Sequence, residues 1–442
     1  MFGDNGVLRV GIDGYNLALP HGTGIATYGA MLARTLRAGG HQVDGVFGLD
    51  VAGPTDQRET LFYDQLARPH PWRMRRKGPR RALAVLSAGR GLAALEVPRG
   101  TVDTRALDHR TAMFDRLWSC PHLFERAHAY FRATGRFVRL RMATPPAVMH
   151  WTYPVPVTLA GTRNVYTLHD LVPLRLPFAT LDEKRQYRAL VAACAARADA
   201  ICTVSETSAA DITALLGVAP ERIVNTYQVS AIEPAVLEEP AATAAAAVHA
   251  TFGLRDRGYF LYFGAIEPKK NIGRLIEAYL SLGTDTPLVI VAGRSWQSEA
   301  ELVLLPRADD PDSPRHAHLE RRIIQIDYLP RHLLMRLLRG ARALTFPSLY
   351  EGFGLPVHEA MLLGVPVLAS ATGAVREVAG DAAVLVDPYD VAAIAVGLRA
   401  LDTDPALRAD LAARGRRQAA RFSAERYAAA LDTLYARAMA AA

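Results

Sequence analysis

The strongest constraint on the fold is a repeated alternation of short apolar runs with segments of helical periodicity. Residues 8–12 form an apolar run, which predicts a buried strand, and a loop rich in turn-forming residues follows it. Apolar residues then recur at helical spacing, at Ile25, Tyr28 and Leu32, before a second apolar run at 43–47. This order of strand, loop, helix and strand is typical of a parallel sheet covered by helices.

The alternation occurs twice along the chain. It restarts at residues 259–263, after a stretch at 233–248 that holds prolines and a run of alanines. Residues 60–145 show a weaker rhythm, and we expect mainly helices there. A chain of 442 residues is long enough for two domains. We predict an α/β protein with two doubly wound, Rossmann-like domains that face each other across a cleft. The predicted parts are an N-terminal domain (1–235), a linker (236–250), a C-terminal domain (251–421) and a C-terminal helix (422–442) that packs back toward the N-terminal domain.

Charge and cysteine content narrow the kind of partner. The formal net charge of +7 suits a phosphate-bearing substrate or an anionic membrane surface. Modules typical of nucleic-acid-binding proteins are absent from the sequence, so we expect no nucleic-acid partner. The cysteines, Cys120, Cys194 and Cys202, lack metal-ligand spacing and favour a reduced, cytoplasmic compartment. We expect neither a signal peptide nor a transmembrane helix. The basic segment 72–81 is either a peripheral contact with the inner face of the membrane or an exposed basic loop.

A glycine-containing loop between a predicted strand and helix carries the densest signal. It lies within residues 345–370 and holds Gly352 and Gly354. Glycines let backbone N–H groups approach a ligand, and a helix N-terminus favours anionic groups. Glu351 and Glu359 flank this loop, and since a carboxylate repels phosphate, we expect both to meet neutral hydroxyls.

Glu351, seven residues and then Glu359 resemble the Glu-x7-Glu motif of family 4 glycosyltransferases, which have the GT-B fold and retain the anomeric configuration. The resemblance extends over about 25 positions around the two glutamates. It implies that Glu359 binds the ribose hydroxyls of a nucleotide-sugar donor and that Glu351 contacts the donor sugar. It also implies that the loop backbone holds the sugar and the phosphates. The loop residues concerned are Gly352, Phe353, Gly354 and Leu355.

A second loop with two lysines follows the strand predicted at 259–263. Loops between a strand and a helix bind phosphates in such folds, and a cation there stabilises a departing diphosphate. The loop resembles the family's Glu-Pro-Arg-Lys-Asn variant, which implies that Lys270 is the diphosphate lysine. Other members carry an arginine where this chain has Ala265, so either Lys269 or Arg294 is expected to supply the second cation.

Two further segments complete the predicted donor site. The first loop contains Gly22 and Gly24 and resembles the family's glycine-rich loop that faces the diphosphate. Tyr328 and Leu329 follow a predicted strand and resemble the turn that binds the nucleotide base.

His169 and Asp170 lie at the end of another predicted strand. They resemble the family's His-Asp-Leu segment, which lines the acceptor side of the cleft. His169 then contacts the donor sugar or the acceptor nucleophile, and Asp170 acts as a base or orients His169. A purely structural His–Asp pair is the alternative.

The acidic stretch with Asp309, Asp310 and Asp312 resembles a metal-binding motif of a different glycosyltransferase fold. Its place between elements of the C-terminal domain favours a solvated loop. We therefore predict no metal cofactor, with a nucleotide-diphosphate sugar as co-substrate.

The family resemblance implies a retaining hexosyltransferase that uses a saccharide or lipid-linked saccharide as acceptor in surface polysaccharide synthesis. The segments 169–173 and 267–271 resemble the mannosyltransferase-type branch, which implies GDP-mannose as the first choice of donor. The alternatives are a sugar-nucleotide epimerase or a glycan phosphorylase on the same fold. A further alternative is a non-catalytic nucleotide-binding partner of a polysaccharide assembly system.

Overall fold

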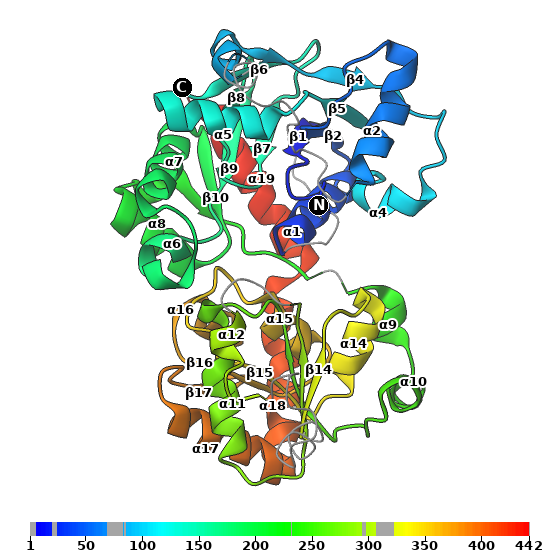
Figure 1. The fold of residues 1–442 in the computed structure, drawn as a ribbon, viewed down its shortest axis with the longest axis vertical. Coiled ribbons are helices and arrows are strands. Elements are labelled where there is room, and N and C mark those ends of the chain that lie inside the picture. The colour runs from blue at the N-terminus through cyan, green and yellow to red at the C-terminus, as the bar shows by residue number, and fades with distance from the viewer. Residues whose placement is uncertain are drawn as a thin grey trace.

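A computed structural model describes residues 6–19, 24–68, 83, 85–230, 232–293, 298–305 and 322–441 of the chain. These residues form two α/β domains, which Figure 1 draws one above the other. Each domain is built around a mainly parallel sheet with helices on its faces. The predicted fold class is confirmed.

The N-terminal sheet contains eight strands in the described part of the chain. All neighbours pair in parallel except β4, which is antiparallel to β5 at the edge of the sheet. The strand order reverses between β1 and β7. The order is β11 (Ile223–Asn225), β10 (Ala200–Thr203), β9 (Arg163–Thr167), β7 (Val148–Trp151), β1 (Arg9–Asp13), β2 (Gln42–Phe47), β5 (Arg116–Ser119) and β4 (Leu95–Val97).

Helices cover this sheet (Figure 1), and the same domain contains a separate three-stranded sheet. The helices are α1 (Gly24–Ala38), α2 (Arg58–Leu66), α4 (Asp108–Thr111), α5 (Leu123–Thr134), α6 (Val172–Arg175), α7 (Lys184–Arg197) and α8 (Glu206–Leu216). The small sheet consists of β3 (Leu92–Ala93), β6 (Val138–Arg141) and β8 (Val157–Leu159). The expectation of mainly helices over residues 60–145 is therefore only partly right. The strands of this region have two to four residues each, too few to show an alternating pattern.

The C-terminal sheet has six parallel strands among the described residues, and its order reverses between β12 and β15. Ligands of doubly wound sheets bind at such a reversal. The order is β14 (Ile323–Ile326), β13 (Leu288–Val291), β12 (Phe260–Phe263), β15 (Ala343–Phe346), β16 (Val367–Ser370) and β17 (Val384–Val386). The helices are α9 (Pro234–Glu238), α10 (Ala241–Phe252), α11 (Ile272–Leu280), α12 (Ser298–Glu301), α14 (Arg331–Arg339), α15 (Leu355–Leu362), α16 (Gly373–Ala379), α17 (Val391–Thr403) and α18 (Pro405–Ala419).

The last helix, α19 (Ala424–Ala440), joins the two domains. It runs from the C-terminal domain into the N-terminal one (Figure 1) and contacts β7, β9, β10 and β11. Its buried face includes Leu431, Leu434 and Tyr435, and the Tyr435 hydroxyl lies 2.8 Å from Nδ1 of His150 on β7.

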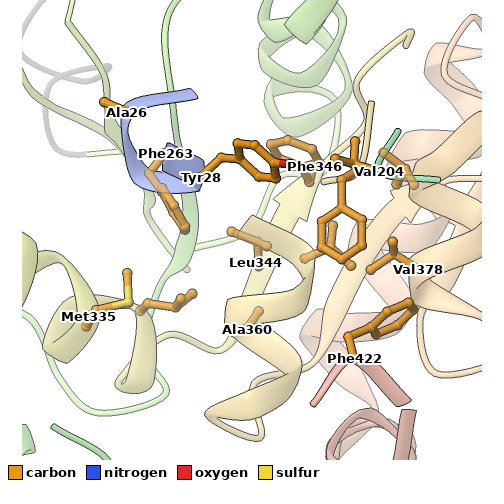
Figure 2. Packing of buried hydrophobic residues seen from close by; sticks show 14 of the residues in the cluster. Ala26, Tyr28, Val204, Phe263, Met335, Leu344, Phe346, Ala360, Val378 and Phe422 are labelled. Atoms are coloured by element: carbon orange, nitrogen blue, oxygen red, sulfur yellow. The ribbon is translucent and has the colours of Figure 1, made fainter. Parts of the chain in front are cut away.

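One hydrophobic cluster crosses the domain boundary. Figure 2 places Tyr28 and Val204 of the N-terminal domain in the same cluster as Phe346 and Val378 of the C-terminal domain. Burial of apolar area from both sides stabilises the domains against each other. Within the described residues, no helix is both long and apolar enough to cross a membrane.

Candidate active site

The loops after β12 and β15 meet at the reversal of the C-terminal sheet. Asn271 ends the first loop in a left-handed conformation, with φ of 62°. Its side-chain amide donates to the carbonyls of Pro347, at 2.9 Å, and Pro388, at 2.6 Å. The backbone N–H of Leu349 donates to the Lys269 carbonyl at 2.7 Å. These hydrogen bonds hold the lysine loop against the loop that carries Glu351.

Lys270 and Glu351 form an ion pair at this junction, with Nζ 2.5 Å from Oε1. Their side chains are only 14% and 11% exposed. Burial alone raises the pKa of the Glu351 carboxyl, but the ammonium groups of Lys270 and Lys269 outweigh burial and hold that pKa below its ordinary value. The Glu351 carboxyl is therefore ionised at neutral pH. The sequence predicted separate partners for these two residues, and the structure brings them into contact.

Glu359 lies on α15 and has a partner that the sequence did not indicate. Arg331, at the start of α14, donates to both carboxylate oxygens at 2.5 and 3.2 Å. Glu359 is almost fully buried, whereas the Arg331 side chain is 40% exposed. Burial raises the pKa of Glu359, and Arg331 offsets this only in part. Tyr328 and Leu329 lie just before Pro330 and the start of α14, so the predicted base-binding turn is next along the chain to Arg331, the partner of the predicted ribose carboxylate.

The loop from Gly352 to Leu355 presents backbone rather than side chains. The Phe353 side chain is buried, and its ring packs against Phe422 and His358, so this residue offers a ligand its backbone. Gly354 has a φ of 104°, which a side chain would disfavour, and it precedes Leu355 at the start of α15. The amides at this helix start suit an anionic group.

Gly352 brings this loop against the N-terminal domain. A Cβ atom at this position would lie 2.6 Å from the backbone oxygen of His169 and 3.2 Å from Oδ2 of Asp170. The residues predicted for the donor side and for the acceptor side therefore meet, and only glycine fits at their contact.

His169 follows β9 and is oriented by the backbone of the residue that follows the neighbouring strand β7. Its Nε2 lies 2.9 Å from the carbonyl oxygen of Thr152, and since a carbonyl only accepts, Nε2 carries the hydrogen. Burial lowers the pKa of His169, so its ring is neutral and Nδ1 is an acceptor. Asp170 instead accepts a hydrogen bond from the Val172 N–H at 3.1 Å. Thr152 rather than Asp170 is thus the hydrogen-bond partner that fixes the His169 ring.

A cavity of about 420 Å³ lies between the domains on the His169 side. Its walls come from the loops after β7 and β9, from α6 and α7, and from the lysine loop. The lining residues are Ile25, Tyr153, Pro154, His169, Asp170, Val172, Pro173, Thr180, Leu181, Asp182, Tyr187, Glu267 and Lys269. Burial acts to lower the pKa of the Lys269 ammonium, but the carboxylates of Glu351 and Asp170 outweigh burial and raise that pKa. Lys269 is therefore a cation that faces the cavity.

Polar contacts between the domains surround the site. The Tyr350 hydroxyl donates to the buried carboxylate of Asp211 on α8, which also accepts from Nε of Arg175 at 2.7 Å. Arg175 ends α6, so one carboxylate connects the residue before Glu351 with a wall of the cavity. A second contact joins α16 to the start of α8, where the Glu377 carboxylate accepts hydrogen bonds from the N–H groups of Glu206 and Thr207, at 2.9 and 3.1 Å.

Some predicted residues lie outside the described part of the chain. They are Gly22, Arg294, the basic segment 72–81 and the acidic residues Asp309, Asp310 and Asp312. Gly24 is the first residue of α1.

Thr152, Tyr350, Asp211 and Arg331 are candidate functional residues that the sequence did not indicate. Each acts through a partner distant in the chain, and no local pattern marks them.

Two facing doubly wound domains, with the Lys270–Glu351 pair at the reversal of the C-terminal sheet, are the arrangement of the GT-B fold of glycosyltransferases. Similar solved structures show the same fold. A sucrose-phosphate synthase from Thermosynechococcus elongatus superposes with a TM-score of 0.65 and 18% identity, over 98% of this chain and 100% of that one. Anabaena Alr3699/HepE in complex with UDP and glucose superposes with a TM-score of 0.62 and 14% identity, over 97% and 99%.

The chain belongs to glycosyltransferase family 4, and it is a glycosyltransferase. Residues 22–227 match the family described as Glycosyltransferase Family 4, and residues 249–418 match Glycosyl transferases group 1. O-antigen chain mannosyltransferase B from Escherichia coli is 34% identical over 60% of this chain and 67% of its own length.

More distant relatives differ in the substrates that their names print. The serotype-specific mannosyltransferase WbdA from Escherichia coli is 29% identical over 62% of this chain, but the match spans only 33% of that larger protein. A D-inositol 3-phosphate glycosyltransferase from Xylanimonas cellulosilytica is 31% identical over 55% of this chain and 58% of its own length.

Proposed function

We propose that this protein transfers a mannosyl residue from GDP-mannose to a hydroxyl of a saccharide or lipid-linked saccharide, with retention of configuration, in surface polysaccharide synthesis. The buried Lys270–Glu351 pair at the reversal between β12 and β15 carries the proposal. A cation and a carboxylate in contact suit a diphosphate that lies beside a sugar hydroxyl. The names of the mannosyltransferase relatives support the choice of sugar, and a neighbour of the same fold in complex with UDP-glucose supports a nucleotide-sugar donor.

The proposed mechanism assigns each charge to a part of the donor. As the bond between the anomeric carbon and the diphosphate breaks, negative charge grows on the leaving oxygen. Lys270 and the amides at the start of α15 stabilise that charge in a site from which water is largely excluded. Glu351 accepts a hydrogen bond from a donor-sugar hydroxyl, and Glu359 accepts hydrogen bonds from the ribose hydroxyls.

The acceptor hydroxyl is proposed to enter from the His169 side and to attack on the face that the diphosphate leaves. In that position Nδ1 of His169 is available as a hydrogen-bond acceptor, because Nε2 is committed to Thr152. None of these side chains is proposed as a covalent nucleophile.

A nucleotide-binding measurement tests the donor site first. Thermal shifts with GDP, UDP, ADP and dTDP in EDTA should show stabilisation by GDP, and Lys270→Ala should abolish it. Arg399→Ala, an exposed cation on α17, is the matched control and should keep the shift. Stabilisation by a different nucleotide alone would contradict GDP-mannose, and no stabilisation by any of them would contradict the donor site.

Turnover then separates the alternatives. A transferase releases GDP from GDP-mannose in proportion to the acceptor glycosylated. Release of GDP without an acceptor requirement, or formation of an epimerised sugar nucleotide, would favour an epimerase. A glycan phosphorylase would instead require inorganic phosphate, and a non-catalytic partner would bind GDP without any turnover.

A further inference from the structure

The charges that line the cavity between the domains are unevenly distributed. Asp170, Asp182 and Glu267 line it, and Lys269 is the cation among the described lining residues. Asp182 and its neighbour Leu181 are exposed at the rim, and Leu181 is 74% exposed. Three carboxylates thus face a space in which one ammonium group lies.

The single ammonium is already balanced by nearby carboxylates. The pKa of Lys269 is raised although burial opposes this, because Glu351, Asp170 and Glu267 all attract its proton. The Tyr153 and Tyr187 hydroxyls also stay protonated, since burial and then the charges of Asp182 and Asp170 raise their pKa values. Among the described residues that line this cavity, acidic side chains thus outnumber basic ones.

These carboxylates are spread over the walls and do not form a cation site. Within the described residues, no three His, Cys, Asp or Glu side chains are grouped so that they could hold a metal ion. Asp182 precedes α7, Glu267 follows β12 in the other domain, and Asp170 follows β9. Carboxylates in this arrangement are suited to accept hydrogen bonds from several hydroxyls of one ligand.

We infer that the sugar residue that enters this cavity as acceptor is uncharged, so that acceptors with a phosphate on that residue are rejected. The inference rests on the proposed function and specifies its acceptor. A phosphate would place two negative charges beside three carboxylates, and unfavourable like-charge contacts suppress wrong partners. Neutral hydroxyls instead gain charge-assisted hydrogen bonds, and the tyrosine rings and Leu181 offer apolar surface to the sugar ring. On this basis the protein differs from relatives whose name prints a phosphorylated inositol.

Acceptor competition tests the inference. With GDP-mannose as donor, methyl α-mannoside and α-mannobiose are compared with mannose 6-phosphate and inositol 3-phosphate, and GDP release is recorded. We expect kcat/KM for the phosphorylated acceptors to be lower by at least about tenfold. Equal use of neutral and phosphorylated acceptors by the wild type would overturn the inference.

Charge substitution at the rim tests whether this cavity determines the preference for neutral acceptors. Asp182→Asn should lower the ratio of kcat/KM for neutral acceptors to kcat/KM for phosphorylated acceptors. Asp182→Lys should lower this ratio further or bring it below one. Asp381→Lys makes the same change of charge at a carboxylate that is 84% exposed in the C-terminal domain, and it should leave the ratio unchanged. A ratio that Asp182→Lys does not alter would contradict the assignment.

A binding measurement keeps the test independent of turnover. In ligand-observed NMR with GDP-loaded enzyme, the wild type should not bind mannose 6-phosphate, whereas Asp182→Lys should. Binding to the wild type as tight as to the variant would overturn the inference even where GDP binding is intact. Absence of GDP binding to the wild type would instead contradict the proposed donor site. Failure of the acceptor inference and failure of the proposed function therefore give different results.

Discussion

Arg331 changes how the predicted ribose carboxylate works. An unpaired carboxylate as buried as Glu359 would tend to take up a proton, because burial disfavours its charged form. The guanidinium binds both of its oxygens and opposes that tendency. The Arg331 side chain is partly exposed, and Arg331 is close in sequence to the turn of Tyr328 and Leu329, where the base is predicted to bind. We therefore regard Arg331 as a positioning residue for the nucleotide.

Arg331→Ala should weaken nucleotide binding about tenfold or more, since charge-assisted hydrogen bonds contribute roughly 1.5–3 kcal/mol. The loss should be larger at about pH 6 than at about pH 8, because the pKa of Glu359 rises further without its partner and more of the carboxyl is protonated at the lower pH. Titration calorimetry at both pH values measures this. Arg331→Lys keeps the charge but lacks the planar fork, so it should restore only part of the affinity. Equal losses at the two pH values would show that the charge state of Glu359 is not involved.

Asp13 gives the protein a stability term that depends on pH. This buried carboxylate accepts hydrogen bonds from the N–H groups of Thr152 and Tyr15, yet burial dominates and raises its pKa from 3.8 to about 6. An acid whose pKa is raised by folding binds more protons folded than unfolded, so its contribution to stability falls as pH rises through that window. The change is at most about 3 kcal/mol, at about 1.4 kcal/mol for each pH unit.

Asp13→Asn removes this titration. The melting temperature of the variant minus that of the wild type should therefore become more positive between about pH 4.5 and about pH 7.5. Differential scanning fluorimetry across that range measures the difference. A difference that is constant with pH would show that Asp13 does not titrate in the folded protein.

At the scale of elements, the site depends on loops after strands that approach within contact distance. Gly352→Ala should push the loop before α15 away from β9, because its Cβ would lie 2.6 Å from the His169 oxygen. Overpacking of this kind costs about 1–3 kcal/mol, and we expect kcat to fall by at least about tenfold as the donor and acceptor sides separate. Gly29→Ala on α1, whose Cβ would meet its nearest neighbours at 3.8 Å, is the control and should be neutral. Full activity in Gly352→Ala would show that this contact is not needed.

The sequence predicts these loops well because their signals are local. Strand, glycine, lysine pair and helix start follow one another within a few residues, and the fold then brings the loops after β12 and β15 together by topology alone. Partners such as Arg331 for Glu359, or Thr152 for His169, lie 28 and 17 residues apart in the chain, and only the tertiary structure brings them together. The short strands β4 and β5 were missed for a related reason, because three or four residues are too few to reveal a period. Neither local sequence signals nor tertiary packing identifies the nucleotide and the sugar, since these depend on side-chain contacts with a ligand.

At the scale of the molecule, the two domains are held together by polar contacts that cross the cleft as well as by the shared hydrophobic cluster. The Tyr350–Asp211 hydrogen bond connects α8 to the residue before Glu351. Glu377 adds a second connection on the neighbouring helix α16. Polar contacts of this kind can be broken and remade, so they suit an equilibrium between open and closed domains.

Removal of the Glu377 carboxylate tests the proposed equilibrium between open and closed domains most directly. Its carboxylate accepts from two backbone N–H groups and from the Thr207 hydroxyl, at 2.9 to 3.1 Å, at the start of a helix in the other domain. Negative charge at a helix N-terminus is stabilising. Glu377→Ala should therefore favour the open arrangement, with a larger radius of gyration by small-angle X-ray scattering and a higher KM for the acceptor. GDP binding should change little, because the Lys270 and Glu359 sites lie within the C-terminal domain.

Asp390→Ala provides the matched control for a lost helix cap. Asp390 accepts hydrogen bonds from the N–H groups of Ala392 and Ala393 at the start of α17, within one domain. Loss of such a cap costs about 1 kcal/mol, so both variants should melt earlier by similar amounts. Only Glu377→Ala should expand the molecule and raise the acceptor KM, because only its cap joins the domains. An equal radius of gyration in the two variants would mean that the shared hydrophobic cluster and the Tyr350–Asp211 contact hold the domains closed without Glu377.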